Sequence, residues 1–167
     1  EVINISSVPS AKQTFSDPFY FLALGFGSGL SKKAPGTCGS LVALLLYLPL
    51  SLLPFWAYIA FVSTAFLLGV YICDRAARKM KIKDPGAIVW DEFVGMWITL
   101  ILVPEGWYFL IVGFLLFRLF DIAKPWPVNY LDRQISGGLG IMVDDVAAGL
   151  YAFASLQLLA YAARTIL

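Results

Sequence analysis

Two adjacent carboxylates, Asp91 and Glu92, lie inside a stretch that is otherwise apolar and aromatic, Val89 to Trp97. Burying an unpaired carboxylate is costly, so acids in such a place need a cation, a proton or a polar partner. Three further acids stand at the edges of apolar runs. The five carboxylates that could do chemistry together are Asp91, Glu92, Asp121, Asp144 and Asp145.

The chain contains no histidine. Chemistry that needs an imidazole is therefore excluded, which covers Ser-His-Asp catalysis, phosphohistidine intermediates and His-ligated metals. Oxygen ligands without His or Cys select hard cations such as Mg²⁺, Mn²⁺ or Ca²⁺. We predict that the five carboxylates form a Mg²⁺ site with one or two ions. The alternative is a set of separate helix caps, which the helix dipole favours at N-termini. It does not explain Asp121, which is expected in the last turn of a helix.

Positive charge accompanies these acids, because Arg118 and Lys124 flank Asp121 in the stretch FRLFDIAKPWP. Asp121 and Lys124 are three residues apart and can pair on one helix face, which is a purely structural explanation. In the functional interpretation, the two cations bind a phosphate group beside the metal. Lys124 is then a catalytic candidate and Arg118 a phosphate-binding one.

A glycine-rich segment offers a second phosphate-binding element. Residues 25–40 read GFGSGLSKKAPGTCGS, with five glycines and one proline, which is typical of a loop. The segment opens a helix, and free N–H groups at a helix start bind anions. We expect Lys33, Gly36, Thr37 and Ser40 to take part in phosphate binding, although glycine-rich turns are common and this one is not a Walker A sequence.

The elements that must position these residues are predicted to be membrane helices. The chain of 167 residues is 60% hydrophobic and 14% charged, against about 25% charged in a typical soluble domain. We expect a single all-α domain over residues 1–167, an integral membrane bundle whose first 17 residues form a mobile or surface-lying arm. The predicted apolar helices are 39–53, 55–73, 87–103, 107–123 and 142–163. In this reading Asp144 and Asp145 lie in the first turn of the last helix.

The distribution of charge predicts the orientation of the bundle. With five spans, eleven of the twelve Lys and Arg residues fall on one side, and only Arg164 falls on the other. The positive-inside rule places the basic side in the cytoplasm, together with all five candidate acids. The net charge of +1 gives no basic surface for nucleic acid. The two cysteines suggest no disulfide framework.

Four motifs in order together resemble one known family. They read GFGSGL…APGTCGSL, IVWDEFVGMWITL, FRLFDIAKPWPVNYLD and GGLGIMVDDVAAG, and the resemblance covers most of the chain, from about residue 19 to 150. The chain resembles bacterial phosphatidylglycerophosphatase A, although the family usually has proline where this chain has Lys32. The resemblance implies a multi-pass, Mg²⁺-dependent enzyme of the bacterial inner membrane. It would remove the terminal phosphate of phosphatidylglycerophosphate to give phosphatidylglycerol.

The resemblance and the residues together define an expected mechanism. The five acids hold Mg²⁺, which binds phosphate oxygens and activates water, and Lys33, Arg118 and Lys124 offset charge in the transition state. Direct attack by water is expected, with a phosphoaspartate intermediate as the alternative. The expected partner is a phospholipid in the bilayer, with no obligate protein partner. The rival function is a transporter or channel with a cation-binding acidic cluster, which fits a one-sided cluster without internal repeats poorly.

Overall fold

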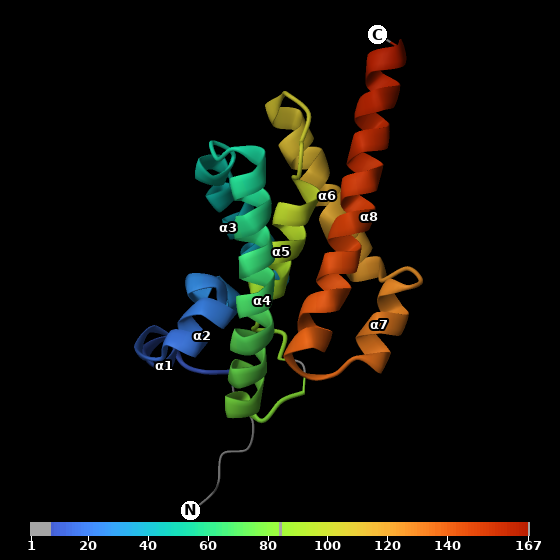
Figure 1. Cartoon of the computed structure of the whole chain (residues 1–167). Coiled ribbons are helices and arrows are strands. Elements are labelled where there is room, and N and C mark those ends of the chain that lie inside the picture. Colours follow the sequence, from blue (N-terminus) through green and yellow to red (C-terminus); the bar gives the residue numbers. More distant parts are fainter. Residues whose placement is uncertain (1–7, 84, 167) are drawn as a thin grey trace, which may run out of the picture.

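The computed structural model describes residues 8–83 and 85–166, so the first seven residues of the predicted arm lie outside it. Within the described residues the chain is all-helical and has no strand, as the sequence predicts. Figure 1 shows a bundle in which the longest helices, α4 and α8, stand side by side along one axis. The elements are α1 (Ala11–Ser16), α2 (Pro18–Ala23), the 3₁₀ helix η1 (Gly25–Leu30), α3 (Pro35–Leu50), α4 (Phe55–Met80), α5 (Trp90–Thr99), α6 (Trp107–Ala123), α7 (Val128–Gln134) and α8 (Gly137–Ile166).

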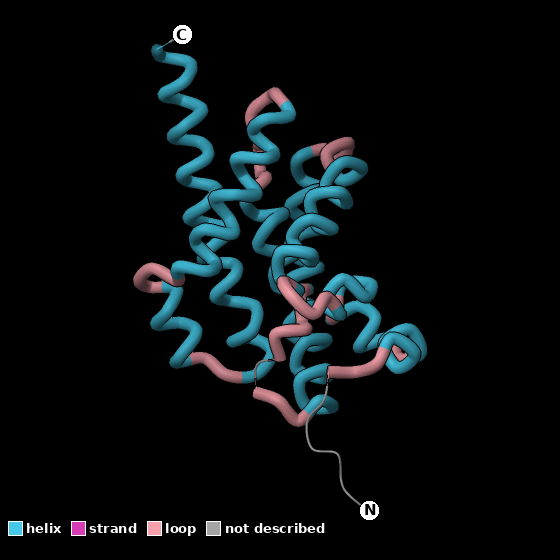
Figure 2. The backbone as a smooth tube through the Cα atoms, turned by 180° about the vertical axis from the view of Figure 1, so that it is seen from behind, coloured by secondary structure: helices cyan, strands magenta, loops and turns pink. Residues whose placement is uncertain are grey.

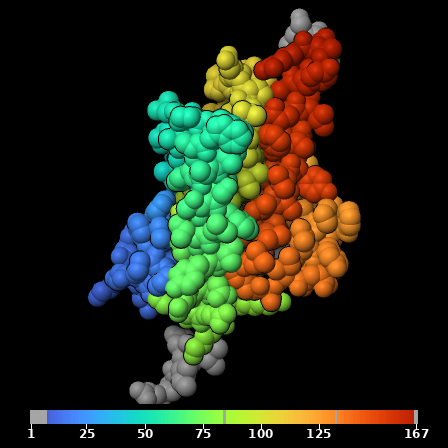
Figure 3. Space-filling model, in the orientation of Figure 1, coloured from blue at the N-terminus to red at the C-terminus, as the bar shows by residue number. Residues whose placement is uncertain are grey.

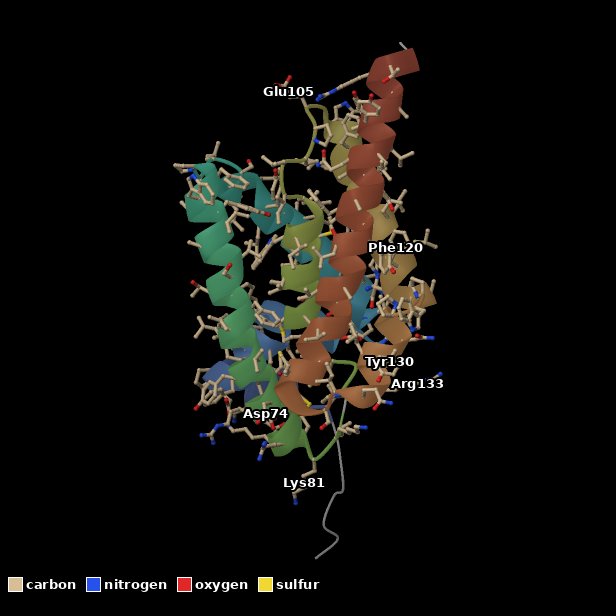
Figure 4. The ribbon with its side chains drawn as sticks, turned by 45° about the vertical axis from the view of Figure 1, so that its right-hand side comes forward. Asp74, Lys81, Glu105, Phe120, Tyr130 and Arg133 are labelled. Atoms are coloured by element: carbon tan, nitrogen blue, oxygen red, sulfur yellow. The ribbon has the colours of Figure 1, made fainter. Side chains whose placement is uncertain are left out.

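The helices α3, α4, α5, α6 and α8 alternate in direction along this axis (Figures 1 and 2). One end carries the α3–α4 turn, the α5–α6 connection with Glu105, and the C-terminus. The other end, which we call the basic end, carries Lys81 and Arg133 (Figure 4). The space-filling view shows α2 and α7 widening the molecule toward the basic end (Figure 3).

Two elements match the sequence prediction closely. Helix α6 spans the expected residues 107–123, and it ends where Lys124 adopts the left-handed conformation (φ 41°) before Pro125. The pair Asp17-Pro18 predicts a short helix through Leu24 with Asp17 as its N-cap. Helix α2 begins at Pro18, and the Asp17 carboxylate accepts hydrogen bonds from Phe19 N at 2.9 Å and Tyr20 N at 3.4 Å. Local capping chemistry determines both of these boundaries, which explains why sequence reasoning finds them.

The helix expected over 87–103 is shorter than predicted. Helix α5 covers only Trp90–Thr99, because both flanking segments are fixed by tertiary contacts. Val89 N–H donates to Ala23 O at 2.9 Å, and the Gln157 amide donates to Leu102 O at 2.9 Å. Ten residues span about 15 Å, roughly half the hydrocarbon core of a bilayer.

The first and last predicted spans begin earlier than expected. Helix α3 starts at Pro35 rather than near residue 39, with proline at its first position, where the missing N–H does no harm. Helix α8 starts at Gly137 rather than at 142. Asp144 and Asp145 therefore lie about two turns inside α8, not in its first turn, and helix capping does not explain them. The residues between the predicted spans 107–123 and 142–163 contain a further helix, α7.

Helix α5 lies at the centre of the bundle, with residues 93–99 all buried. Its indole groups anchor it to two neighbours, because Trp90 Nε1 donates to Ala65 O of α4 and Trp97 Nε1 donates to Ala43 O of α3, each at 3.0 Å. Against α8 the backbones touch. A Cβ placed on Gly149 would lie 2.5 Å from Gly95 O, so only glycine permits this approach.

Among the described residues, α4 and α8 are long and apolar enough to cross a membrane, judged by length and composition, and α3 is apolar but shorter. Long apolar side chains point outward from several helices, including Leu67 of α4, Leu115 of α6 and Leu158 of α8. An outward apolar surface on this scale is unusual for a soluble monomer and is suited to lipid.

Candidate metal and phosphate site

Three of the predicted acids form a compact cluster where α5 meets α8, which we call the carboxylate trio: Asp91, Glu92 and Asp145. Each offers one oxygen atom, and these atoms all lie within 4.8 Å of one another. Among the described residues, Asp91 Oδ1, Glu92 Oε2 and Asp145 Oδ2 are buried without a hydrogen-bond partner. Buried carboxylate oxygens that repel one another require a cation or protons, so this cluster calls for a positive ligand.

The other two predicted acids are paired with cations instead. The Asp121 carboxylate forms an ion pair with Arg118 on the last turns of α6. The Lys124 ammonium donates to Asp144 Oδ2 at 2.9 Å. The structure thus brings all five acids to one region and divides them into the trio and two acids with cationic partners.

Arg118 connects the trio to the paired acids. Its Nη1 lies 4.0 Å from Glu92 Oε1, and its side chain is 15% exposed. Among the described residues its Nε atom is buried without a hydrogen-bond partner. The guanidinium therefore keeps donor capacity beside the trio, as a phosphate-binding arginine needs.

The glycine-rich segment reaches the same place through Gly36, in the first turn of α3. A Cβ on Gly36 would lie 2.4 Å from Glu92 Oε1 and 3.0 Å from Arg118 Nη1. The absence of a side chain lets the α3 backbone approach both groups. Gly36 is thus the residue through which this segment lies against Glu92 and Arg118.

The remaining predicted residues of this segment are placed differently. Ser40 is fully buried, and its hydroxyl donates to Gly36 O at 2.8 Å, so it fixes the first turns of α3. Lys33 is exposed before the helix, and Thr37 is half-buried within it. In the described part of the chain, neither Lys33 nor Thr37 hydrogen-bonds to the trio. The phosphate-binding role of these three residues stays a prediction.

Sequence reasoning missed one residue that positions the site. Asp74 of α4 accepts a hydrogen bond from Gly138 N at 3.3 Å, and it also pairs with Arg78 at 2.7 Å. This contact caps the start of α8, the helix that carries Asp145. The only signal in the sequence is the glycine pair 137–138, and nothing in it points to a capping residue on another helix.

The donor set of the trio fits a hard divalent cation. All its ligand atoms are carboxylate oxygens, and ligands on opposite sides of such an ion stand about 4–5 Å apart. The 4.8 Å limit within the trio matches a single ion of this kind. The Cys73 thiol is buried on α4 and donates a weak hydrogen bond to Met142 Sδ at 3.9 Å. The trio itself offers only oxygen atoms as ligands.

Fold and site together define the class: an all-helical, strongly apolar protein with a buried carboxylate cluster next to an arginine and a lysine. The family model described as phosphatidylglycerophosphatase A matches residues 21–160, a range that includes every candidate site residue. The chain belongs to the phosphatidylglycerophosphatase A family, and it is an enzyme of the phosphatase class.

Three curated relatives are similar over most of their length. Phosphatidylglycerophosphatase A of Escherichia coli is 45% identical over 86% of this chain and 84% of its own. The Haemophilus influenzae protein of the same name is 46% identical over 86% and 90%. A Bacteroides thetaiotaomicron protein, provisionally named phosphatidylinositol-3-phosphatase, is 42% identical over 79% and 87%. No solved structure matches the chain.

Proposed function

We propose that this protein is a Mg²⁺-dependent lipid phosphatase that hydrolyses the terminal phosphate of phosphatidylglycerophosphate, giving phosphatidylglycerol and inorganic phosphate. The names of two relatives at 45% and 46% identity support the substrate. The observation that carries the chemistry is the carboxylate trio with its buried, unpartnered oxygens next to Arg118. A phosphatase needs such a pairing of cation-binding oxygens with fixed positive charge.

The five acids would have two different roles. Asp91, Glu92 and Asp145 would hold the cation, and Asp121 and Asp144 would lie next to this trio. Bound Mg²⁺ would supply Lewis acidity toward phosphate oxygens and lower the pKa of water.

The cationic side chains act on the phosphate itself. Arg118 donates to the phosphate oxygens that face α6. The Lys124 ammonium, held by Asp144, offsets negative charge as water adds to phosphorus and the bond to the glycerol oxygen breaks. Gly36 lets the α3 backbone lie against Glu92 and Arg118, and Lys33, Thr37 and Ser40 complete the surrounding segment. Direct attack by water is the proposed route. A trapped, labelled acyl-phosphate on an Asp or Glu would replace it with a phosphoenzyme route.

The proposed location is the bacterial inner membrane, with several spans and the site on the cytoplasmic side. Support comes from the apolar helices α4 and α8 and from Asp91 and Glu92, which lie in the first turn of α5, the end of that helix that faces the basic end of the bundle (Figure 1). The lipid is the proposed partner, and no obligate protein partner is proposed. The acidic cluster alone would also suit a cation transporter, but the family match favours the enzyme.

A second lipid substrate is favoured by one specific observation, the name of the 42% identical Bacteroides protein. Phosphatidylinositol 3-phosphate also carries a phosphate monoester on a lipid headgroup, and the trio and Arg118 contact only such a phosphate in our proposal. The two substrates therefore differ in parts of the headgroup that lie beyond the phosphate.

The deciding experiment measures phosphate release from both lipids by the full chain in mixed micelles, with Mg²⁺ and with EDTA. We expect Mg²⁺-dependent release from phosphatidylglycerophosphate, and a loss on the order of 100-fold in Asp91→Asn and Asp144→Asn. The matched control is Glu105→Gln, an exposed acid at the opposite end. Full activity in both site variants would refute the site, and preference for the inositol lipid would replace the substrate.

A further inference from the structure

We infer that Asp121 is a positioning residue for Arg118 rather than a ligand of the metal. The inference deepens the proposed function and rests on it for the identity of the phosphate ligand. It assigns separate tasks within the acidic cluster: the trio holds the cation, and the Asp121–Arg118 pair holds the arginine that binds the substrate phosphate.

The geometry of the Arg118–Asp121 pair supports this assignment. Arg118 and Asp121 are three residues apart on α6, so both side chains lie on one helix face, and they form a direct ion pair. Both are largely buried, with 15% and 14% of their side chains exposed. A partly buried pair of this kind holds a long side chain in one geometry more firmly than a surface pair does.

The position of Asp121 near the end of α6 also supports this assignment. It lies two residues before the end of α6, where the helix dipole disfavours a carboxylate. The arginine one turn earlier compensates for that charge. Asp121 also lies within interaction range of Asp145, so a fourth metal ligand is the competing assignment. The compact group of ligand atoms, however, contains the trio without Asp121.

Arg118 also has N–H donors that Asp121 does not engage. A guanidinium has five N–H donors in a rigid fork, and Asp121 engages Nη1. Among the described residues Nε is buried and has no hydrogen-bond partner, while Nη1 lies 4.0 Å from Glu92 Oε1. Gly36 adds no side chain of its own here, so the α3 backbone lies directly against Glu92 Oε1 and the guanidinium. A tetrahedral oxyanion there would satisfy the spare donors and also reach a cation held by the trio.

Two titrations that need no turnover separate the assignments, using the full chain in detergent. The first measures Mn²⁺ binding by electron paramagnetic resonance. We expect Asp145→Asn to lose at least about tenfold in Mn²⁺ affinity and Asp121→Asn to stay within about threefold of wild type. Equal losses in the two variants would make Asp121 a ligand and overturn the inference.

The second titration measures inorganic phosphate binding by calorimetry at saturating Mg²⁺. We expect a loss of about tenfold in Asp121→Asn and in Arg118→Gln. The double variant should bind phosphate no more weakly than Arg118→Gln alone, because a positioning residue acts only through its partner. Additive losses, or unchanged phosphate affinity in Asp121→Asn, would overturn the inference.

Two further variants keep the test informative if Asp121→Asn does not fold. If Asp121→Asn fails to fold, Asp121→Ser repeats it, and Arg118→Lys probes the pair from the other side. Arg118→Lys keeps the charge but loses the fork, so it should weaken phosphate binding and leave Mn²⁺ affinity unchanged. Loss of Mn²⁺ binding in Arg118→Lys would contradict separate tasks. These titrations remain decisive even if the wild-type protein hydrolyses neither lipid.

Discussion

At the scale of single residues, Gly36 packs most directly against the charged groups of the site. It lies in the first turn of α3, and the space beside its Cα is bounded by Glu92 Oε1 and the Arg118 guanidinium. Its backbone is helical, so the reason for glycine is the close approach and not an unusual conformation. A side chain at this position would collide with the neighbouring charged groups.

We predict that Gly36→Ala lowers activity although alanine favours the helix. Alanine is the better helix former by about 1 kcal/mol, so its helical propensity favours the fold. The added methyl group would stand 2.4 Å from Glu92 Oε1, which forces the trio or Arg118 to move. A displacement of about 1 Å in a catalytic group lowers activity on the order of 100-fold.

The matched control is Gly86→Ala, because Gly86 has no atom within 4 Å of its would-be Cβ. Phosphate release and thermal unfolding in detergent should be measured for both variants. Wild-type activity in Gly36→Ala would show that the close contact of this residue with Glu92 and Arg118 is not needed for activity. A similar loss in Gly86→Ala would point to a general effect of alanine in this part of the chain.

At the scale of the elements, the crossing of α5 and α8 sets the geometry of the trio. Asp91 and Glu92 come from α5 and Asp145 from α8, and the two backbones meet at Gly95 and Gly149. Thr99 of α5 reinforces the crossing, since its hydroxyl donates to Gly95 O at 2.9 Å and contacts Gly149 O at 3.4 Å. The trio can form only while this crossing stays close.

Gly149→Ala should therefore lower both stability and cation affinity. A Cβ at this position would lie 2.5 Å from Gly95 O, which is backbone and cannot rotate away. We expect a loss of about 1–3 kcal/mol in unfolding free energy, as overpacking produces. The control is Gly113→Ala, whose Cβ meets the flexible end of Leu100 at 3.1 Å and should cost less. Equal effects of the two variants on unfolding and Mn²⁺ binding would contradict the argument.

The start of α2 provides a pH-dependent test at the same scale. Burial by itself raises the pKa of Asp17, but the ion pair with Lys79 and the N–H groups of Phe19 and Tyr20 outweigh it, so the pKa lies below its ordinary value. A carboxyl group with a lowered folded-state pKa stabilises the protein above its unfolded-state pKa. That stabilisation is lost as the pH falls through the folded-state pKa.

Asp17→Ala should consequently cost about 1 kcal/mol at neutral pH, mostly through the lost cap. The difference in unfolding free energy from wild type should stay constant down to about pH 4 and shrink below it. Denaturant unfolding in detergent between pH 7 and pH 3 measures this. A difference that grows on acidification would have the wrong sign for the Asp17–Lys79 pair.

At the scale of the whole molecule, the sequence predicts what local chemistry determines and misses what distant contacts determine. The bounds of α6 and the cap of α2 follow from proline, a capping acid and apolar periodicity. The length of α5 does not, because Ala23 and Gln157 fix its flanks from other parts of the chain. The start of α8 depends in the same way on Asp74 of α4.

The site shows the same division between local and distant information. The residue types and the absence of histidine predict oxygen ligands for a hard cation, and the alternating helices bring all five acids together. Which acids face one another and which face Arg118 or Lys124 depends on helix rotation and side-chain geometry. A spacing pattern contains neither. The sequence therefore predicts that five acids converge, but not that three form a compact cluster and two pair with Arg118 and Lys124.

The orientation of the bundle is the last property that the whole molecule determines. Arg133 lies at the basic end and Glu105 at the opposite end (Figure 4), and both side chains are exposed. The positive-inside rule predicts that the basic end faces the cytoplasm. In a background with Cys38→Ala and Cys73→Ala, Glu105→Cys should react with an impermeant maleimide in intact spheroplasts. Arg133→Cys should react only after the membrane is opened, since the bilayer then no longer separates it from the reagent. The reverse pattern would place the site on the outer face of the membrane and overturn the proposed orientation.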